Sequence, residues 1–474
     1  MKKPDFLKKA KHIHFVGIKG VGMTALALCA QDLGIKVGGC DIGEVFVTDR
    51  ILKERKIKWN VGFDPVHLQP KPDLVITTGA HGGLKNPEVL VAKKMSIPIL
   101  TQAQAFGKFM SEKDGISVCG VGGKSTTASM IATVFSHAQR KPSYAIGVAE
   151  IKPLGVAGKY TSGKEFIAEA DEYVNSLGVD NRVKFFFQHP KVIVVTNIEH
   201  DHPDVYPSIK ETKKTFKKFF ETIPSGGLLV ACVDNSNVED VVQKFPRPLQ
   251  TYGCSSQANW QVKKIDSAPG QFSFKLLYRG EIFDQIEIKV PGKFNVLNAT
   301  ATFIVARFFG ISPKLIKEGL AKFGGTKRRF EFIGETGKVK LYDDYAHHPK
   351  EIKATLEAAK TWFPQNRIAV IFQPHTYSRT KALFNEFART FSLADLVIIT
   401  DIYASAREKD DLGINSQVLV KEASKYHPQV IYKRGKKEVI EFLKKKIKFG
   451  DIIFTMGAGD IFLWHQNILK SLKN

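Results

Sequence analysis

The sequence predicts a three-domain α/β protein in which helices cover mostly parallel sheets. Short apolar segments alternate with amphipathic helical segments along most of the 474 residues, which is typical of strand–helix–strand units. Several of these apolar segments run directly into glycine-rich or polar loops, where open α/β sheets bind their ligands. From these two observations we place the domains at residues 1–112, 113–325 and 326–474.

The composition excludes several classes of protein. A hydrophobic content of 43% supports large cores and argues against a mostly disordered chain. No apolar stretch approaches the length of a membrane span, and the basic N-terminus lacks a signal-peptide core, so we expect no membrane insertion and a cytoplasmic location. The five cysteines contain no Cys-x-x-Cys pair, which favours reduced thiols over a zinc site or a disulfide framework.

The net charge of +23 raises the hypothesis of a nucleic-acid partner. The densest basic runs, at residues 210–218 and 433–448, interleave lysines with apolar residues at helical spacing, as the solvated faces of amphipathic helices do. No recognised nucleic-acid-reading module accompanies the charge. We therefore expect no nucleic-acid partner, and keep a basic nucleic-acid-binding ATPase as the alternative from another functional class.

The N-terminal segment has the outline of a Rossmann-like nucleotide-binding unit. A predicted strand at residues 12–16 leads into the glycine-rich loop at residues 17–23, which opens a helix. A second predicted strand, at residues 36–40, ends at Asp41, where an acid can reach a ribose hydroxyl. The glycine spacing departs from the strict dinucleotide pattern, so a tight structural turn remains an alternative.

The central segment begins with a predicted phosphate loop at residues 120–127, between an apolar strand at 116–119 and a helical pattern. Glycines let the backbone turn its N–H groups inward, Lys124 can reach the outer phosphates, and the Ser125 hydroxyl can reach Mg²⁺. Val118 stands where the strict pattern has a glycine, and an ordinary strand-to-helix turn is the alternative. The loop predicts a P-loop ATPase domain.

Two polar clusters follow other predicted strands of this central domain. Residues 169–172 end one strand with three carboxylates, and residues 197–202 end another with carboxylates and imidazoles. Mg²⁺ prefers oxygen ligands, so we expect these clusters to bind divalent cations beside a phosphate. The alternating pattern of residues 259–290 predicts extra antiparallel strands attached to the sheet.

The third segment repeats the strand–helix alternation and predicts a further Rossmann-like domain. Its predicted strands are residues 339–342, 368–372, 396–400, 430–432 and 452–455. Polar loops at 343–349 and 373–379 follow two of these strands and predict a ligand surface. Asn295 could pair with a base edge or cap a helix, and the adjacent Arg328 and Arg329 could hold phosphate or form surface salt bridges.

In this order the motifs resemble those of the Mur ligases, which extend the peptide of the bacterial cell-wall precursor. The matching segments are residues 17–23, 86–88, 120–127, 169–172, 197–202, 295–298, 327–332, 343–349, 373–379 and 456–460. The loops at 343–349 and 373–379 are most similar to those of the alanine-adding member. The resemblance implies an N-terminal domain for the UDP-sugar, a central ATPase, and a C-terminal domain that binds the amino acid.

The resemblance also implies roles for individual residues. Those at the UDP-sugar are Gly17, Gly20, Gly22, Met23 and Asp41. Those at ATP are Gly120, Gly122, Gly123, Lys124, Ser125, Thr126, Asn295, Asn298, Arg329 and Asp344. Those around the amino acid are His348, His375 and Arg379. The catalytic positions are Lys124, Glu169, His202 and His348, and the metal positions are Ser125, Glu169 and His202.

The implied activity joins L-alanine to the lactyl carboxylate of UDP-N-acetylmuramate through an acyl phosphate, with ATP as co-substrate and release of ADP and phosphate. Mg²⁺ or Mn²⁺ is the implied cation, and a monomer or weak homodimer is the expected state. A catalytically dead relative is the less favoured alternative, because Lys124, Ser125, Glu169 and His202 are all retained.

The chain departs from the family pattern at several positions. Val121 and Gly122 stand where the family loop usually has threonine and histidine, and Phe294 replaces a histidine beside the adenine. Thr376 stands where alanine-adding ligases usually carry an arginine. Residues 175–189 are extra, and with the preceding acidic motif they resemble the family's muropeptide-recycling ligase, which adds a tripeptide. That activity is the alternative within the family.

Overall fold

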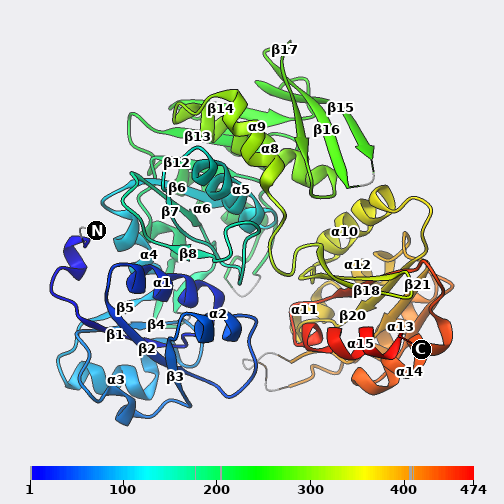
Figure 1. The fold of residues 1–474 in the computed structure, drawn as a ribbon, viewed down its shortest axis with the longest axis horizontal. Helices are drawn as coiled ribbons and strands as arrows, with labels where there is room; N and C mark the ends of the chain where they lie inside the picture. Colours follow the sequence, from blue (N-terminus) through cyan, green and yellow to red (C-terminus); the bar gives the residue numbers. More distant parts are fainter. Residues whose placement is uncertain are drawn as a thin grey trace. The chain divides into compact units, whose positions relative to one another are not determined.

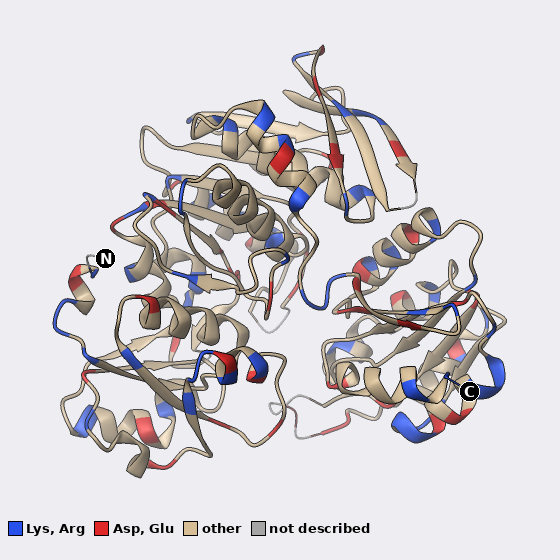
Figure 2. Cartoon of the chain, viewed as in Figure 1, with Lys and Arg blue, Asp and Glu red and all other residues tan. Residues whose placement is uncertain are grey.

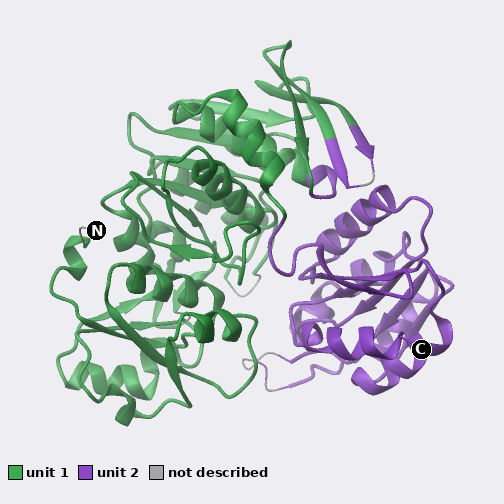
Figure 3. Cartoon of the chain, in the orientation of Figure 1, with its two compact units in different colours: residues 1–265, 273–289, 295–324 green, residues 266–272, 290–294, 325–474 purple. Residues whose placement is uncertain are grey.

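The computed structural model describes residues 3–473 except 177, 203–204, 269, 405–407 and 409. The chain divides into two compact units (Figure 3). The first contains residues 1–265, 273–289 and 295–324, and the second contains residues 266–272, 290–294 and 325–474. The α/β class predicted from the sequence is confirmed, whereas the domain boundaries at 112 and 325 stay predictions.

The N-terminal part of the first unit is a five-stranded parallel sheet with strand order β3-β2-β1-β4-β5 (Figure 1). Its strands are β1 (His12–Val16), β2 (Lys36–Asp41), β3 (Lys58–Val61), β4 (Leu74–Thr77) and β5 (Ile99–Thr101). The strand order reverses at β1: the sheet grows from β1 to β2 and β3 on one side, and to β4 and β5 on the other. The loop after β1 therefore lies at a topological switch point, where such sheets bind ligands.

A ten-stranded sheet follows, with order β17-β16-β15-β14-β13-β12-β6-β9-β7-β8. Its strands are β6 (Asp114–Cys119), β7 (Ser143–Ala145), β8 (Gly158–Lys159), β9 (Glu165–Glu169), β12 (Val192–Val195), β13 (Leu228–Cys232), β14 (Leu249–Gly253), β15 (Trp260–Ala268), β16 (Gln271–Tyr278) and β17 (Glu281–Ile288). Strand β6 lies between β12 and β9 and is parallel to both. The loops that follow these three strands therefore meet at one edge of the sheet.

The second unit holds a six-stranded sheet with order β18-β19-β23-β20-β21-β22. Its strands are β18 (Glu331–Thr336), β19 (Val339–Asp344), β20 (Ile368–Phe372), β21 (Leu396–Ile399), β22 (Val430–Tyr432) and β23 (Ile452–Met456). The five predicted strands of this domain are confirmed. Strand β18 was not predicted, because it pairs antiparallel with β19 at the sheet edge and mixes buried, half-buried and exposed residues without a continuous apolar run.

Helices cover these sheets, and a small hairpin stands apart from them. The helices are α1 (Val21–Asp32), α2 (Asp49–Glu54), α3 (Pro87–Lys94), α4 (Gln102–Met110), α5 (Lys124–His137), α6 (Ile209–Phe220), α7 (Ser236–Val242), α8 (Lys293–Phe308), α9 (Pro313–Lys322), α10 (Pro349–Trp362), α11 (Tyr377–Ala382), α12 (Phe384–Arg389), α13 (Ser416–Ala423), α14 (Gly435–Lys446) and α15 (His465–Ser471). The hairpin pairs β10 (Val174–Ser176) with β11 (Asp180–Val183).

The two basic runs form amphipathic helices, as their spacing predicts (Figure 2). In α6 the phenylalanine rings at 216, 219 and 220 are fully buried, while Lys214, Lys217 and Lys218 are exposed or nearly so. In α14 the apolar side chains of Val439 and Leu443 are buried in the same way. Among the described residues no helix is long and apolar enough to cross a membrane.

A buried carboxylate of α3 bonds to side chains of β1, of β2 and of the 3-10 turn Pro65–Leu68. Glu88, from α3, lies 2.6 Å from the His14 imidazole and 2.7 Å from that of His67, and it accepts a hydrogen bond from the Cys40 thiol at 3.0 Å. Burial opposes the charge of Glu88, but these contacts outweigh it and hold its pKa below the ordinary value. The separations are those of hydrogen bonds, so the group is a structural network beneath the first glycine-rich loop.

Candidate active site

The phosphate loop adopts a conformation that only glycine permits at two of its positions. Gly120 has a φ of +124°, and a Cβ atom there would lie 2.3 Å from the Thr196 hydroxyl oxygen. Gly123 has a φ of +85° and is the N-cap of α5. Lys124, Ser125 and Thr126 begin that helix, so the loop presents its backbone amides and the helix N-terminus together, as an anion site requires.

Asn197 fixes the two loop residues that depart from the family pattern. Its side-chain carbonyl accepts hydrogen bonds from the backbone N–H groups of Val121 (2.8 Å) and Gly122 (3.0 Å). Its amide donates to the Gly122 carbonyl at 3.0 Å, and the Thr196 hydroxyl donates to the same carbonyl at 2.6 Å. Asn197 was not among the predicted site residues, although its place just after the neighbouring strand β12 was the available signal.

Lys124 forms a salt bridge with the carboxylate of Glu172. Its Nζ atom donates to both carboxylate oxygens of Glu172, at 3.0 and 2.8 Å. Burial opposes the charge, but the nearby Glu172 and Asp171 outweigh it and raise the pKa of Lys124 above its ordinary value. The ammonium is therefore charged and available to a phosphate, which would have to replace Glu172 as its partner.

A carboxylate–imidazole cluster lies beside the loop. Ligand atoms of Glu172, Asp201 and His202 lie within 4.8 Å of one another, and the His202 ring packs 4.8 Å from the ring of Tyr173. Glu169 is not part of that trio. Its Oε1 atom accepts a hydrogen bond from the Gly147 N–H at 2.8 Å.

These donors suit a hard divalent cation. Carboxylate oxygens are the ligands that Mg²⁺ prefers, and a single imidazole is compatible with Mg²⁺ or Mn²⁺. The ordinary repulsion between close carboxylates is relieved here by Lys124 and by Lys184, whose ammonium donates to Asp171 at 2.7 Å. The structure thus places His202 beside Glu172 and Asp201, near the phosphate loop. The metal-binding role of His202 stays a prediction, and Glu172 and Asp201 were not among the predicted metal residues.

Two amide side chains of α8 lie at the same loop. Asn298 donates to Asn295 at 3.1 Å, and both side chains are buried. A Cβ atom at Gly123 would lie 3.0 Å from the Asn298 amide oxygen, so the pair stands against the start of α5. Helix α8 begins at Lys293, which places Asn295 inside the first turn and not at the N-cap. The helix-cap alternative for Asn295 is therefore wrong.

The first glycine-rich loop is equally crowded. A Cβ atom at Gly17, whose φ is +81°, would lie 2.5 Å from the Thr78 methyl group, and one at Gly22 would lie 2.2 Å from the Gln102 amide. Gly20 is the N-cap of α1, and Met23 is buried in its first turn. Loop and helix N-terminus thus have the geometry that an anion site requires, and the contacts of these residues with a UDP-sugar stay predictions.

Asp41 has a structural contact that the sequence did not predict. Its carboxylate accepts hydrogen bonds from the backbone N–H groups of Lys19 (2.7 Å) and Ile42 (2.8 Å). Burial raises its pKa, while these bonds and nearby cations act in the opposite direction. Asp41 therefore fixes the backbone beside the predicted nucleotide, and its contact with a ribose stays a prediction.

In the second unit, the paired arginines have different surroundings. Arg328 is buried and donates to the Asp343 carboxylate at 2.9 Å and to the Gly457 carbonyl at 2.6 Å. The Arg329 guanidinium is one-third exposed and lies 5.2 Å from the Tyr345 ring. Asp344 accepts hydrogen bonds from two backbone N–H groups, and burial raises its pKa to about 6. Arg329, not Arg328, can therefore turn toward a ligand.

The predicted amino-acid residues are only partly brought together. Arg379 donates to the His375 carbonyl at 3.3 Å, and the His375 ring stacks on that of Tyr403. Burial, with help from His347 and Arg379, lowers the pKa of His375 to about 3, so this imidazole is neutral. Of the adjacent His347 and His348, it is His347 that lies beside His375, with 6.0 Å between the ring centroids, although His347 was not predicted as a site residue.

The predicted His348 has a helix-capping position instead. It is the N-cap of α10, and its Nδ1 atom accepts a hydrogen bond from the Lys350 N–H at 3.2 Å. Its predicted contact with the amino acid is untested and stays a prediction.

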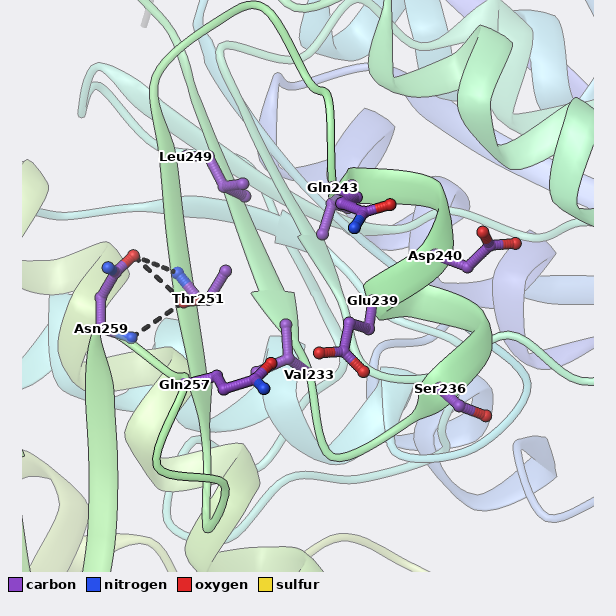
Figure 4. A pocket seen from close by; sticks show the side chains of 10 residues that line it. Val233, Ser236, Glu239, Asp240, Gln243, Leu249, Thr251, Gln257 and Asn259 are labelled. Carbon is purple, nitrogen blue, oxygen red and sulfur yellow. Dashed lines mark hydrogen bonds between the residues drawn. The ribbon is translucent and has the colours of Figure 1, made fainter.

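A cavity of about 510 Å³ lies elsewhere in the first unit, between α7 and the strand β14 (Figure 4). Its lining includes Glu239, Asp240 and Gln243 from the helix and Thr251 and Asn259 from the sheet. None of the predicted site residues lines it, and its two carboxylates disfavour anionic ligands. It is separate from the site built on the phosphate loop.

Comparison with known proteins agrees with this arrangement. Three family models match consecutive parts of the chain: "Mur ligase family, catalytic domain" at residues 12–114, "Mur ligase middle domain" at 118–306, and "Mur ligase, glutamate ligase domain" at 328–459. The chain is 38% identical over 473 residues to UDP-N-acetylmuramate–L-alanine ligase of Caldanaerobacter subterraneus subsp. tengcongensis, covering 98% of this chain and 99% of that protein.

Solved structures show the same likeness along the whole chain. The UDP-N-acetylmuramate-alanine ligase of Thermotoga maritima superposes with a TM-score of 0.81 at 26% identity, covering 97% of this chain and 98% of that one. A murein peptide ligase from Psychrobacter arcticus gives a TM-score of 0.70 at 25% identity, covering 98% and 99%.

Proposed function

The chain belongs to the Mur ligase family, and we propose that it joins L-alanine to the lactyl carboxylate of UDP-N-acetylmuramate in peptidoglycan precursor synthesis. ATP is converted to ADP and phosphate in the reaction. The observation that carries the proposal is the phosphate loop with Lys124 beside Glu172, Asp201 and His202, in a chain that matches alanine-adding ligases over nearly its full length.

The residues present account for activation of the carboxylate. A carboxylate is a poor electrophile, so its oxygen first attacks the γ-phosphorus of ATP, the bond to ADP breaks, and an acyl phosphate forms. Lys124 neutralises charge that develops on the transferred group, and the loop amides orient it. Glu172, Asp201 and His202 would hold a divalent cation, which when bound neutralises phosphate charge, and Ser125 and Glu169 stay predicted metal positions.

The amide bond forms in the second step. The amine of the amino acid attacks the acyl carbon, the tetrahedral intermediate collapses, and phosphate leaves. We assign the amino-acid carboxylate to Arg379, since a guanidinium pairs well with carboxylates. His375 is neutral, so it would contribute hydrogen bonding and not charge. The cytoplasm is the proposed location, Mg²⁺ or Mn²⁺ the cation, and a monomer or weak homodimer without a nucleic-acid partner the working form.

Addition of a tripeptide is the second candidate activity. The extra segment forms the β10–β11 hairpin and the residues after it, with Asn175 donating to Asp180 at 2.9 Å. Thr376 also stands where an arginine is expected in alanine-adding ligases, and here its hydroxyl caps α11 and lies 3.0 Å from the Ser378 hydroxyl. Neither feature alters the phosphate-loop residues to which the activation step is assigned, so both activities share that step.

Release of ADP in the presence of defined substrates distinguishes these activities. We expect ADP release with UDP-N-acetylmuramate plus L-alanine, and none when either is omitted. Release with the tripeptide but not with L-alanine would establish the second candidate. ATP turnover that is stimulated by DNA or RNA and indifferent to the UDP-sugar would contradict both and support the nucleic-acid alternative.

Replacement of Asn197 by alanine is expected to raise the KM for ATP by about tenfold, with a smaller change in kcat. The substitution removes three hydrogen bonds to the phosphate loop, each worth about 1 kcal/mol in net terms, and part of that loss falls on the bound state. Steady-state kinetics with ATP varied at saturating UDP-sugar and L-alanine provides the measurement.

A matched control for this variant is Asn237→Ala, which removes an amide bonded to the carbonyl of Ile198, the residue after Asn197. We expect its KM for ATP to stay near the wild-type value. Equal effects of the two substitutions would mean that general weakening of the segment, and not loop anchoring, sets nucleotide affinity.

A further inference from the structure

Lys19 lies within the first glycine-rich loop, yet its side chain is only 2% exposed. Its Nζ atom donates hydrogen bonds to the backbone carbonyls of Ile42, at 3.2 Å, and of Glu44. The same atom lies 3.5 Å from a carboxylate oxygen of Asp49. The ammonium therefore sits in a buried cage formed by the segment that follows β2.

Aromatic rings complete this cage. The Lys19 ammonium lies 4.8 Å from the ring centroid of Phe46 and 5.9 Å from that of Trp59, within the range of cation–π attraction. The Lys19 backbone is fastened as well, because its N–H donates to Asp41 at 2.7 Å and its carbonyl accepts from the Thr48 hydroxyl. One residue thus binds both ends of the segment 42–48 to the glycine-rich loop.

The charges of this region depend on Lys19. Asp41 is buried, with the Lys19 ammonium offsetting part of its charge and the His81 ring at 3.6 Å. In the described part of the chain, the buried Oδ1 atom of Asp49 accepts no hydrogen bond, and its ion pair is with Lys19. Without the ammonium, Asp49 would lose its ion pair, and Asp41 would lose one of the charges that offset its own.

The N-terminus of α1 is where the proposed UDP-sugar site would bind the diphosphate. Gly20 is the N-cap of α1, and the first N–H groups of the helix have no intrahelical acceptor. A diphosphate placed there gains from the helix dipole, and loses from each unpaired carboxylate nearby. Lys19 removes most of that repulsion while its own side chain points into the cage.

We propose that Lys19 is a positioning residue of the UDP-sugar site, which compensates Asp41 and Asp49 and holds segment 42–48 against the glycine-rich loop. The inference rests on the proposed function, since it assigns the diphosphate of the UDP-sugar to this loop. Lys19 acts through its neighbours and does not itself contact the ligand.

Replacement of Lys19 by methionine tests this assignment. We expect the KM for UDP-N-acetylmuramate to rise about tenfold or more, with kcat and the KM values for ATP and L-alanine within about threefold of wild type. Adding Asp49→Asn to this variant removes a stranded carboxylate and is expected to return much of the lost affinity. Lys19→Arg retains the charge and is expected to show a smaller rise.

The controls separate charge compensation from folding and from the reaction itself. Lys36→Met removes an exposed lysine at the start of β2 and is expected to leave all KM values unchanged. Calorimetric binding of UDP alone to the full chain, with thermal unfolding of each variant, provides a readout independent of catalysis. An unchanged affinity for UDP in Lys19→Met would overturn the inference, as would failure of Asp49→Asn to restore affinity in a folded double variant.

The same measurements distinguish this inference from the proposed function. If the wild-type chain binds UDP but releases no ADP with the UDP-sugar and L-alanine, the proposed function fails while the role of Lys19 is still measured by calorimetry. If the ligase reaction proceeds normally in Lys19→Met, the inference fails and the proposed function stands.

Discussion

Replacement of Lys124 by alanine is expected to lower the rate of ADP formation by about 10³-fold. The reason is that Lys124 is the cation at the start of α5 that a γ-phosphate would meet, and its raised pKa keeps it charged over the working pH range. The substitution also leaves Glu172 without its bidentate partner, which adds negative charge where the phosphates bind. Initial rates of ADP release at saturating substrates provide the measurement.

Lys191→Ala is the matched control for that variant. Lys191 forms an ion pair at 3.1 Å with Asp114, the first residue of β6, at the end of that strand away from the phosphate loop. Both side chains are partly exposed. We expect its turnover to stay within about twofold of wild type, since exposed ion pairs contribute little. A Lys124→Ala enzyme that kept more than a tenth of the wild-type rate would remove Lys124 from the reaction.

Replacement of His202 by alanine is expected to lower kcat by about 10²-fold at ordinary Mg²⁺ concentrations and to shift the Mg²⁺ dependence to higher concentration. In the described part of the chain, the imidazole is the nitrogen ligand that lies within 4.8 Å of carboxylate oxygens of Glu172 and Asp201. Removing it leaves the remaining ligands with a lower affinity for the cation. Titration of ADP release with Mg²⁺ and with Mn²⁺ measures both effects.

His200→Ala provides a close comparison, because His200 lies two positions earlier and has a different contact. Its Nε2 atom is 2.8 Å from the carbonyl oxygen of Tyr206, which fixes the loop without reaching the carboxylates. We expect its Mg²⁺ dependence to match wild type. An unchanged Mg²⁺ dependence in His202→Ala, or the same shift in both variants, would contradict the assignment of His202 as a metal ligand.

Much of the fold could be predicted because each parallel strand is a short, continuous apolar run. The strand at His12–Val16 has the predicted bounds, and Ile368–Phe372 and Val430–Tyr432 agree to the residue. The edge strand Glu331–Thr336 lacks that signal because one face and one edge meet solvent, so its residues are polar or alternate irregularly.

Within the candidate site, the sequence predicted residues of single motifs but not the contacts between motifs. The loop sequence pointed to Lys124, and the strand-end clusters at 169–172 and 197–202 pointed to cation-binding side chains. Only the resemblance to the family chose Glu169 and His202 from these clusters. The partnership of Lys124 with Glu172, and of Asn197 with the loop amides, depends on which strands are neighbours in the sheet. Sequence spacing does not reveal that β6 lies between β9 and β12.

The contacts of Asn197 explain how the phosphate loop keeps its shape despite its departures from the family pattern. Family members usually have threonine and histidine at positions 121 and 122. Valine and glycine have no polar side chain, so here the backbone makes the hydrogen bonds of these two positions. Asn197 binds both N–H groups, so the loop is held in shape without the usual side chains. This reading favours a working phosphate site and not a catalytically dead relative.

The fate of the carboxylate oxygen tests the central claim most directly. UDP-N-acetylmuramate labelled with ¹⁸O in its lactyl carboxylate is incubated with the enzyme, ATP, L-alanine and Mg²⁺, and the phosphate and UDP-sugar product are analysed by mass spectrometry. We expect one labelled oxygen in each phosphate released and a product carrying L-alanine in amide linkage. Unlabelled phosphate, or ADP formed without an amide product, would contradict an acyl-phosphate ligase.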